Sequence, residues 1–208
     1  YFLAIAIVIQ HRINKIYKGP GWWALGCVST AAAFMLMLLS DIVRVPVILI
    51  NTMLFCGLVF IYTGIMRFLN RKENISLIFT LITVFFFLSF YVLYFIRNNF
   101  AATLILYFSV VIIVTLISKN LIFNGKSAVN ITARFMGAVF FIYGCFYLFK
   151  IILALATGHI DSIFNPSPVQ TVSFMAMLAV SVLLTFGFII MLYQQLSAES
   201  LEDKELFE

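Results

Sequence analysis

The chain has 208 residues, of which 64% are hydrophobic and 10% are charged, and its mean hydropathy is +1.13. Water-soluble globular proteins use about 25% charged residues, so this composition excludes a soluble domain and predicts an all-α, polytopic membrane protein. The formal net charge of +5 comes from basic loops and needs no nucleic-acid partner, although contact with anionic membrane lipid is expected.

Seven apolar stretches separated by short polar loops indicate membrane spans. They lie at residues 1–10, 23–40, 45–68, 75–96, 100–118, 134–157 and 170–193. Tyr1 to Ile9 would rise only about 14 Å as a helix, less than half of a bilayer, and the chain does not begin with Met. We therefore expect residues upstream of Tyr1, and a bundle of seven transmembrane helices whose first member is incomplete in this sequence.

Basic residues gather in the loops on one side of this expected bundle. They are Arg12, Lys15, Lys18, Arg67, Arg71, Lys72, Lys119, Lys126 and Arg134. The loops on the other side hold only Arg44 and Arg97. Because cytoplasmic loops are enriched in Lys and Arg, the sequence predicts an N-terminus outside, a cytoplasmic C-terminus and a multi-pass location in the cell (inner) membrane.

The second and third spans carry two local signals. Gly19-Pro20-Gly21 predicts a tight turn, and the paired Trp22 and Trp23 suit the headgroup level, where an indole is wet at one edge. Gly57 and Gly64 are seven residues apart, which places them two helical turns apart on one face of the third span. We expect another helix to approach closely along that face.

Residues 19–72 read Gly-x-Gly-Trp-Trp-Ala-Leu-Gly, then an apolar span, then a short loop with Arg44 and Pro46. Four more residues precede a basic turn: Asn51, Gly57, Gly64 and Phe68. This pattern resembles the seven-helix membrane sensor modules of bacterial signalling proteins, which stand before a PAS domain, a GGDEF diguanylate cyclase domain or a histidine kinase domain. The resemblance implies that residues 1–193 form a sensor domain and that residues 194–208 form a cytoplasmic signalling helix leading to an output domain. This sequence has no Gly-Gly-Asp-Glu-Phe motif and no phospho-accepting His region, so the resemblance assigns no output chemistry, and whether the full protein is an enzyme stays open.

The last span, residues 170–193, runs into the charged stretch 194–208 with no Gly or Pro between them. We expect one continuous helix that leaves the bilayer and passes a signal to the cytoplasm, within a homodimer. Tyr193, Leu196 and Leu201 are the residues expected to transmit it. Leu196 and Leu201 are five residues apart, which departs from a heptad and predicts a short or imperfect coiled coil.

The sixth span contains Lys150, seven residues before Thr157. A Lys at the centre of a membrane helix costs about 2.5–3.5 kcal/mol, so neighbouring groups are expected to solvate it. Spacings of 4, 3, 4 and 3 place it in a stripe on one helix face with Tyr143, Tyr147, Ala154 and Thr157. We expect this stripe to face the bundle.

Three further polar residues have a depth similar to that of Lys150: Asn51, Tyr107 and Ser173. Together with Tyr143 and Tyr147, they are candidates for lining an outward-opening cavity that takes a small-molecule or lipid-like ligand. The alternative is structural, with Lys150 snorkelling to the interface or bonding to Asn51 and Tyr147 as a link between helices. The sequence leaves both interpretations open.

The outer loop after the sixth span contains His159 and Asp161. Two ligands are too few for a metal site, and His159 is instead a candidate for a pH-responsive neighbour of Lys150. The three cysteines lie within predicted spans and lack metal-type spacing: Cys27, Cys56 and Cys145. The sequence therefore predicts no metal and no cofactor.

Three classes of function are compatible with a membrane bundle. A transporter or channel would use an acidic residue within the spans or paired broken helices, but every Asp and Glu is in a loop or the tail. An intramembrane enzyme would need paired carboxylates, a His-rich cluster or a Ser/His pair within the spans. We therefore expect a sensory module that passes an extracellular or intramembrane signal to a cytoplasmic PAS plus GGDEF or histidine kinase output, with a transporter or channel as the alternative.

Overall fold

The computed structural model describes residues 19–39, 46–123, 129–158 and 168–206. Within these residues the secondary structure is helical, in the order α2 (Pro20–Leu39), α3 (Val47–Phe68), α4 (Ile75–Tyr91), the π-helical turn η1 (Val92–Ile96), α5 (Asn99–Phe123), α6 (Asn130–Thr157) and α7 (Pro168–Leu206). In this part of the chain, six helices are long and apolar enough to cross a membrane, α4 and η1 counting as one. The all-α prediction is confirmed. The first predicted span, residues 1–10, lies outside the described residues.

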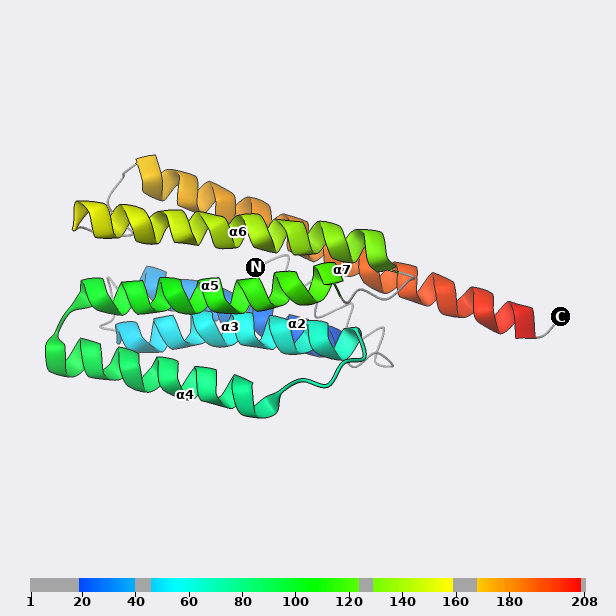
Figure 1. Cartoon of the computed structure of the whole chain (residues 1–208), viewed down its shortest axis with the longest axis horizontal. Helices are drawn as coiled ribbons and strands as arrows, with labels where there is room; N and C mark the ends of the chain where they lie inside the picture. The colour runs from blue at the N-terminus through cyan, green and yellow to red at the C-terminus, as the bar shows by residue number, and fades with distance from the viewer. Residues whose placement is uncertain (1–18, 40–45, 124–128, 159–167, 207–208) are drawn as a thin grey trace.

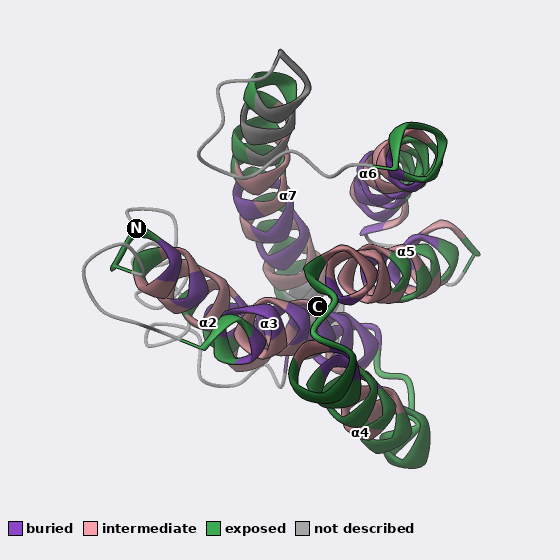
Figure 2. Ribbon diagram, turned by 90° about the vertical axis from the view of Figure 1, so that its left-hand side faces the viewer, coloured by how far each residue is buried: buried purple, intermediate pink, exposed green. Residues whose placement is uncertain are grey.

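Successive helices run in opposite directions, so their termini gather at the two ends of the bundle (Figure 1). α2 packs against α3, α3 against α5, α5 against α6 and α6 against α7, while α4 lies against α3 and α5. Figure 2 shows that α4 turns a largely exposed surface outward. At its C-terminal end α7 extends beyond the other helices (Figure 1).

The loop predicted between the fifth and sixth spans, residues 119–133, is shorter than expected, because α5 and α6 both extend into it. Leu121 in the last turns of α5 is fully buried. The Ser118 hydroxyl donates a hydrogen bond of 2.8 Å to the carbonyl oxygen of Gly137 on α6. Packing against α6 therefore keeps this end of α5 helical, an effect that the polar residues around Lys119 do not reveal.

Four glycines bring the backbones of α2 and α3 into contact. A β-carbon added to Gly26 would lie 2.7 Å from the carbonyl oxygen of Gly57, and one added to Gly19 would lie 2.8 Å from that of Gly64. Small residues allow such close backbone approach, and the resulting van der Waals packing is a main source of helix association in lipid. The close approach predicted at Gly57 and Gly64 is confirmed, and the partner is α2.

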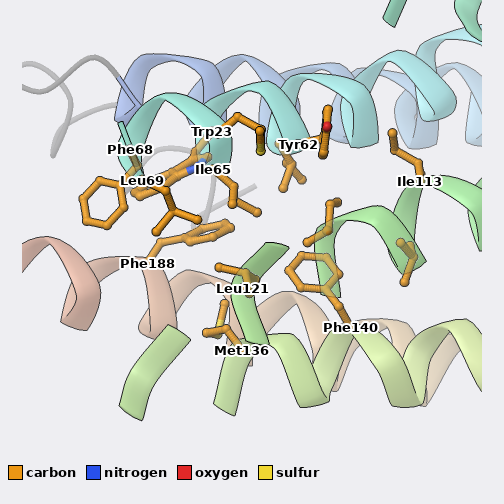
Figure 3. Close-up of a cluster of buried hydrophobic side chains, with 14 of the residues drawn as sticks. Trp23, Tyr62, Ile65, Phe68, Leu69, Ile113, Leu121, Met136, Phe140 and Phe188 are labelled. Atoms are coloured by element: carbon orange, nitrogen blue, oxygen red, sulfur yellow. The ribbon is translucent and has the colours of Figure 1, made fainter. Parts of the chain in front are cut away.

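Trp23 lies in the core, so the expectation that one edge of its indole is wet is not met. It is 1% exposed, and its ring stacks on that of Phe188 from α7 with centroids 4.3 Å apart (Figure 3). Pro20 occupies the first turn of α2, where its missing N–H costs no hydrogen bond, so the helix starts three residues before the predicted boundary at residue 23. Because α2 begins earlier, Trp23 is already inside the helix and faces α3 and α7.

α7 is attached to the bundle through its middle. Gly187 faces the side chain of Met136 on α6, with no room for a β-carbon between them. Phe188 rests on Trp23 of α2, and Met191 is fully buried one turn later. Figure 3 shows Trp23, Met136 and Phe188 converging from α2, α6 and α7. Two neighbours, α6 and α2, therefore hold α7.

Basic residues divide unequally between the two ends of the described helices. Five lie at the end where α3 and α5 finish and where α4 and α6 begin: Arg67, Arg71, Lys72, Lys119 and Arg134. In the part of the chain that the structure describes, the opposite end carries Arg97. This grouping is the basis of the predicted sidedness.

We predict that a cysteine replacing Lys72 is protected from an impermeant maleimide in intact cells, whereas one replacing Asn99 is labelled. Lys72 lies just before the start of α4, and Asn99 lies at the start of α5, at the opposite end of the bundle. Both residues are exposed, so the reactivity of each cysteine depends on the side of the membrane that it faces. The measurement is the mass shift of the protein before and after permeabilisation. The background chain has alanine in place of Cys27, Cys56 and Cys145, and the reverse labelling pattern would invert the topology.

Candidate functional site

Four of the candidate residues form a single cluster between α5 and α6. The Lys150 Nζ atom lies 4.7 Å from the ring centroid of Tyr107 and 5.7 Å from that of Tyr147. The Tyr107 and Tyr147 rings meet edge to face, with centroids 5.4 Å apart and an interplanar angle of 78°. The Tyr143 hydroxyl donates a hydrogen bond of 3.3 Å to the Tyr147 hydroxyl. We call these four residues the Tyr–Lys cluster.

The packing of α5 on α6 sets the level of this cluster. Ser118 and Gly137 meet near one end of the two antiparallel helices. Tyr107 lies eleven residues from Ser118, and Tyr147 and Lys150 lie ten and thirteen residues from Gly137 in the same direction. Equal rise along both helices therefore brings Tyr107 level with the tyrosine and lysine of α6.

The tyrosine rings explain how a lysine is tolerated within a membrane-spanning helix. An ammonium over an aromatic face is stabilised by about 0.5–2 kcal/mol, the larger value applying where water is excluded. Two rings therefore offset much of the roughly 2.5–3.5 kcal/mol that a central lysine costs. Lys150 as a whole residue is half buried.

Asn51 is on α3, which is not one of the two helices that form the Tyr–Lys cluster. It is buried on α3, one turn before Phe55, whose ring centroid lies 4.6 Å from that of Phe85 on α4. α3 and α4 are antiparallel, so one further turn along each brings Asn51 level with Ser89. Ser89 is fully buried, and within the described residues its hydroxyl has no hydrogen-bond partner. Helical spacing therefore places Asn51 on the face of α3 that carries Phe55, and Ser89 on the face of α4 that carries Phe85.

The remaining candidates are placed only in part. Ser173 belongs to α7, but its side chain lies outside the description, and His159 lies outside the described residues altogether. Of the transmission candidates, Leu196 packs against the core, whereas Tyr193 and Leu201 are 70% and 61% exposed. The exposed pair is available to a partner beyond the bundle.

Sequence reasoning missed an ion pair at the basic end of the bundle. The guanidinium of Arg67 forms a salt bridge with Glu73, and Arg67 Nε donates to both carboxylate oxygens at 2.8 Å. The same guanidinium lies 4.5 Å from the ring centroid of Trp22. One signal was present, because Glu73 is the only acidic residue between Asp41 and Asp161. The group joins the start of α2 to the turn between α3 and α4.

Comparison of the chain with protein-family models, with curated proteins and with solved structures gave no match. The resemblance of residues 19–72 to membrane sensor modules therefore stays a prediction.

Proposed function

We propose that the chain is the sensory membrane module of a bacterial signal-transduction protein, in which the Tyr–Lys cluster receives the signal and α7 passes it to a cytoplasmic output domain. One observation carries this proposal: α7 is a single unbroken helix of 39 residues, Pro168–Leu206. Such a helix is about 58 Å long, nearly twice the roughly 30 Å thickness of a hydrocarbon core. A rigid element of that length can carry a movement out of the membrane.

The packing of α6 supports a route from the cluster to α7. α6 carries Lys150 and Tyr147 at one end and Met136 at the other, where Met136 contacts Gly187 of α7. A ligand that prefers one arrangement of α5 and α6 would shift this contact, whereas a ligand with equal affinity for both arrangements would shift nothing. Because Gly187 has no side chain to yield, a displacement of α6 at Met136 is passed directly to the backbone of α7.

The exposed side of α7 supports a homodimer. Tyr193 and Leu201 lie eight residues apart, which separates them by about 80° around the helix axis, so both fit on one broad exposed side. Pairing of two copies along this face would couple the rotation of one α7 to the other. The proposed output is a PAS domain with a GGDEF diguanylate cyclase, or a histidine kinase, in the cytoplasm.

The test of this function rotates the part of α7 after Ser197 relative to the bundle. With the chain fused after Glu208 to a reporter histidine kinase, insertion of one Ala after Ser197 rotates the kinase by about 100° relative to the bundle and is expected to invert or silence its output. The control inserts seven residues at the same place, which rotates the helix by about 700°, within about 20° of the original phase, and is expected to restore it. Kinase activity and membrane expression are measured for each.

Unchanged output after the single insertion would make α7 a tether and remove the proposed transmission. The same pair of variants distinguishes the sensory module from the alternative, a transporter or channel. Transport through the bundle does not depend on the phase of a helix outside the membrane, so solute uptake into cells would be equal for both insertions.

A further inference from the structure

A groove runs between α4 and α5 on the outside of the bundle. Its volume is about 340 Å³, at the small end of the range for ligand pockets. Phe55 of α3 and Phe85 of α4 meet at its base. Its walls include Leu88 of α4 and Ile105 and Phe108 of α5. The groove is thus a separate apolar site, on the side of α5 away from the Tyr–Lys cluster.

The groove opens toward the surface that would face lipid. Four residues along its rim are between 46% and 56% exposed: Val84, Leu88, Phe108 and Ile112. The buried residues of α4, by contrast, are Phe85 and Ser89, with Val92 following in η1. α4 therefore contacts the bundle along a narrow strip, and the groove lies beside that strip.

An apolar groove of this kind, within a membrane, is filled by an acyl chain. Lipid tails are as apolar as the groove, so filling it adds packing contacts but no hydrophobic driving force. Selection of one lipid over another must therefore come from the headgroup.

Arg97 stands where such a headgroup would be. It lies in the two-residue turn between η1 and α5, beyond one end of the groove, and is exposed. By helix rise it is about 12 Å beyond Ile105, the nearest groove residue on α5. An acyl chain lying in the groove would thus have its glycerol and phosphate at the level of the guanidinium. Arg offers a planar set of donors that matches a phosphate.

The turn holds Arg97 in a defined place. Its backbone is left-handed, with φ of 56°, and its N–H donates to the carbonyl oxygen of Val92. The N–H of Asn98 donates to the same oxygen at 3.2 Å, and the Asn98 side chain accepts a hydrogen bond of 3.0 Å from the N–H of Ala101. π-Helical turns such as η1 often mark functional sites. Here the turn fixes the backbone of the basic residue that lies beyond the end of the groove.

We infer that the groove between α4 and α5 binds one anionic phospholipid, with an acyl chain against Phe55, Phe85 and Phe108 and the phosphate against Arg97. This site does not depend on the proposed sensory function. It joins an apolar slot to a basic residue at one end, which is the arrangement that an anionic amphiphile requires.

The test uses the full chain in lipid nanodiscs that contain a trace of phospholipid with a photoactivatable diazirine on its acyl chain. The probe is phosphatidylglycerol in one sample and phosphatidylcholine in the other. Cross-linked peptides are located by mass spectrometry. Phosphatidylglycerol is expected to label residues 81–88 and 105–112 more than the other exposed helix surfaces, and phosphatidylcholine is expected to label all of them evenly.

Two variants sharpen the result. Arg97→Asn removes the charge and keeps a residue that tolerates a left-handed backbone, so groove labelling by phosphatidylglycerol is expected to fall about fivefold, the equivalent of the roughly 1 kcal/mol that a basic residue contributes near anionic lipid. Arg97→Lys is expected to retain most of it. Ser109→Trp fills the groove and is expected to remove labelling there, while Ile152→Trp, on an exposed surface of α6, is the matched control.

Equal labelling by the two lipids in the wild type, or unchanged phosphatidylglycerol labelling in Arg97→Asn, would overturn the proposal. The labelling would then come from the lipid that surrounds any membrane protein. The wild-type labelling map stands even if Ser109→Trp fails to fold. Neither outcome bears on α7, so failure of this site and failure of the sensory proposal are distinguished.

Discussion

Gly26→Ala is expected to lower the melting temperature of the protein, although Ala is the better helix former by about 1 kcal/mol. The new methyl group would lie 2.7 Å from the backbone carbonyl oxygen of Gly57, and also 2.7 Å from the Ile61 side chain. A backbone oxygen cannot move aside as the end of a side chain can, so α2 and α3 must separate. Overpacking of this kind lowers the free energy of unfolding by about 1–3 kcal/mol. The separation of α2 and α3 also weakens their packing along the whole glycine contact.

Thermal unfolding in detergent, followed by intrinsic fluorescence, measures this effect. Trp22 and Trp23 both lie on α2, so the signal reports the helix that is displaced. Gly144→Ala is the matched control, because its β-carbon would lie 3.5 Å from Val114, an ordinary contact. The control gains helix propensity without a clash, and its melting temperature should equal or exceed that of the wild type. Equal melting temperatures for Gly26→Ala and Gly144→Ala would contradict the close backbone contact.

Lys150→Met is expected to abolish the difference in reporter output between stimulated and unstimulated cells without destabilising the protein. The substitution removes stabilisation by Tyr107 and Tyr147, about 0.5–2 kcal/mol for each ring. It also removes the cost of placing a lysine in the membrane, about 2.5–3.5 kcal/mol. These terms have opposite sign and similar size, so the melting temperature should stay close to that of the wild type while the charge that receives the signal is lost.

Lys150→Arg is the control, since it keeps a cation over the two tyrosine rings and should keep the response. The measurements are kinase output of the fusion and melting temperature of the purified chain. If Lys150 only links helices, Lys150→Met will lower the melting temperature and leave the response intact, and the signal site would then have to be sought elsewhere.

Several features of the fold were predictable from local properties of the sequence. Backbone polar groups in lipid must bond within their own helix, so each long apolar stretch among the described residues is a helix close to its predicted limits. Gly57 and Gly64 predicted a close contact because their spacing places them on one face. The stripe of Tyr143, Tyr147 and Lys150 was likewise visible from its period, and the structure adds Tyr107 to it.

Other features depended on which helices are neighbours. Trp23 was expected to keep one edge of its indole in water, yet it is buried against Phe188, a residue far away in the sequence. Asn51 was grouped with Lys150 by depth, but it is on α3, and its spacing from Phe55 places it on the helix face that meets Phe85 of α4. Counting residues along a helix gives the depth of a side chain in the membrane. The helix that the side chain faces depends instead on how the helices pack.

The sequence by itself determined that the chain is a set of membrane-length helices, that α7 continues unbroken past the apolar region, and that a lysine lies within a span. Only the tertiary structure decided which faces meet: the glycine contact with α2, the tyrosine rings beneath Lys150 and the groove between α4 and α5. The reason is physical. Lipid tails and a protein core are equally apolar, so hydropathy separates membrane from water but cannot separate a lipid-facing side chain from a buried one.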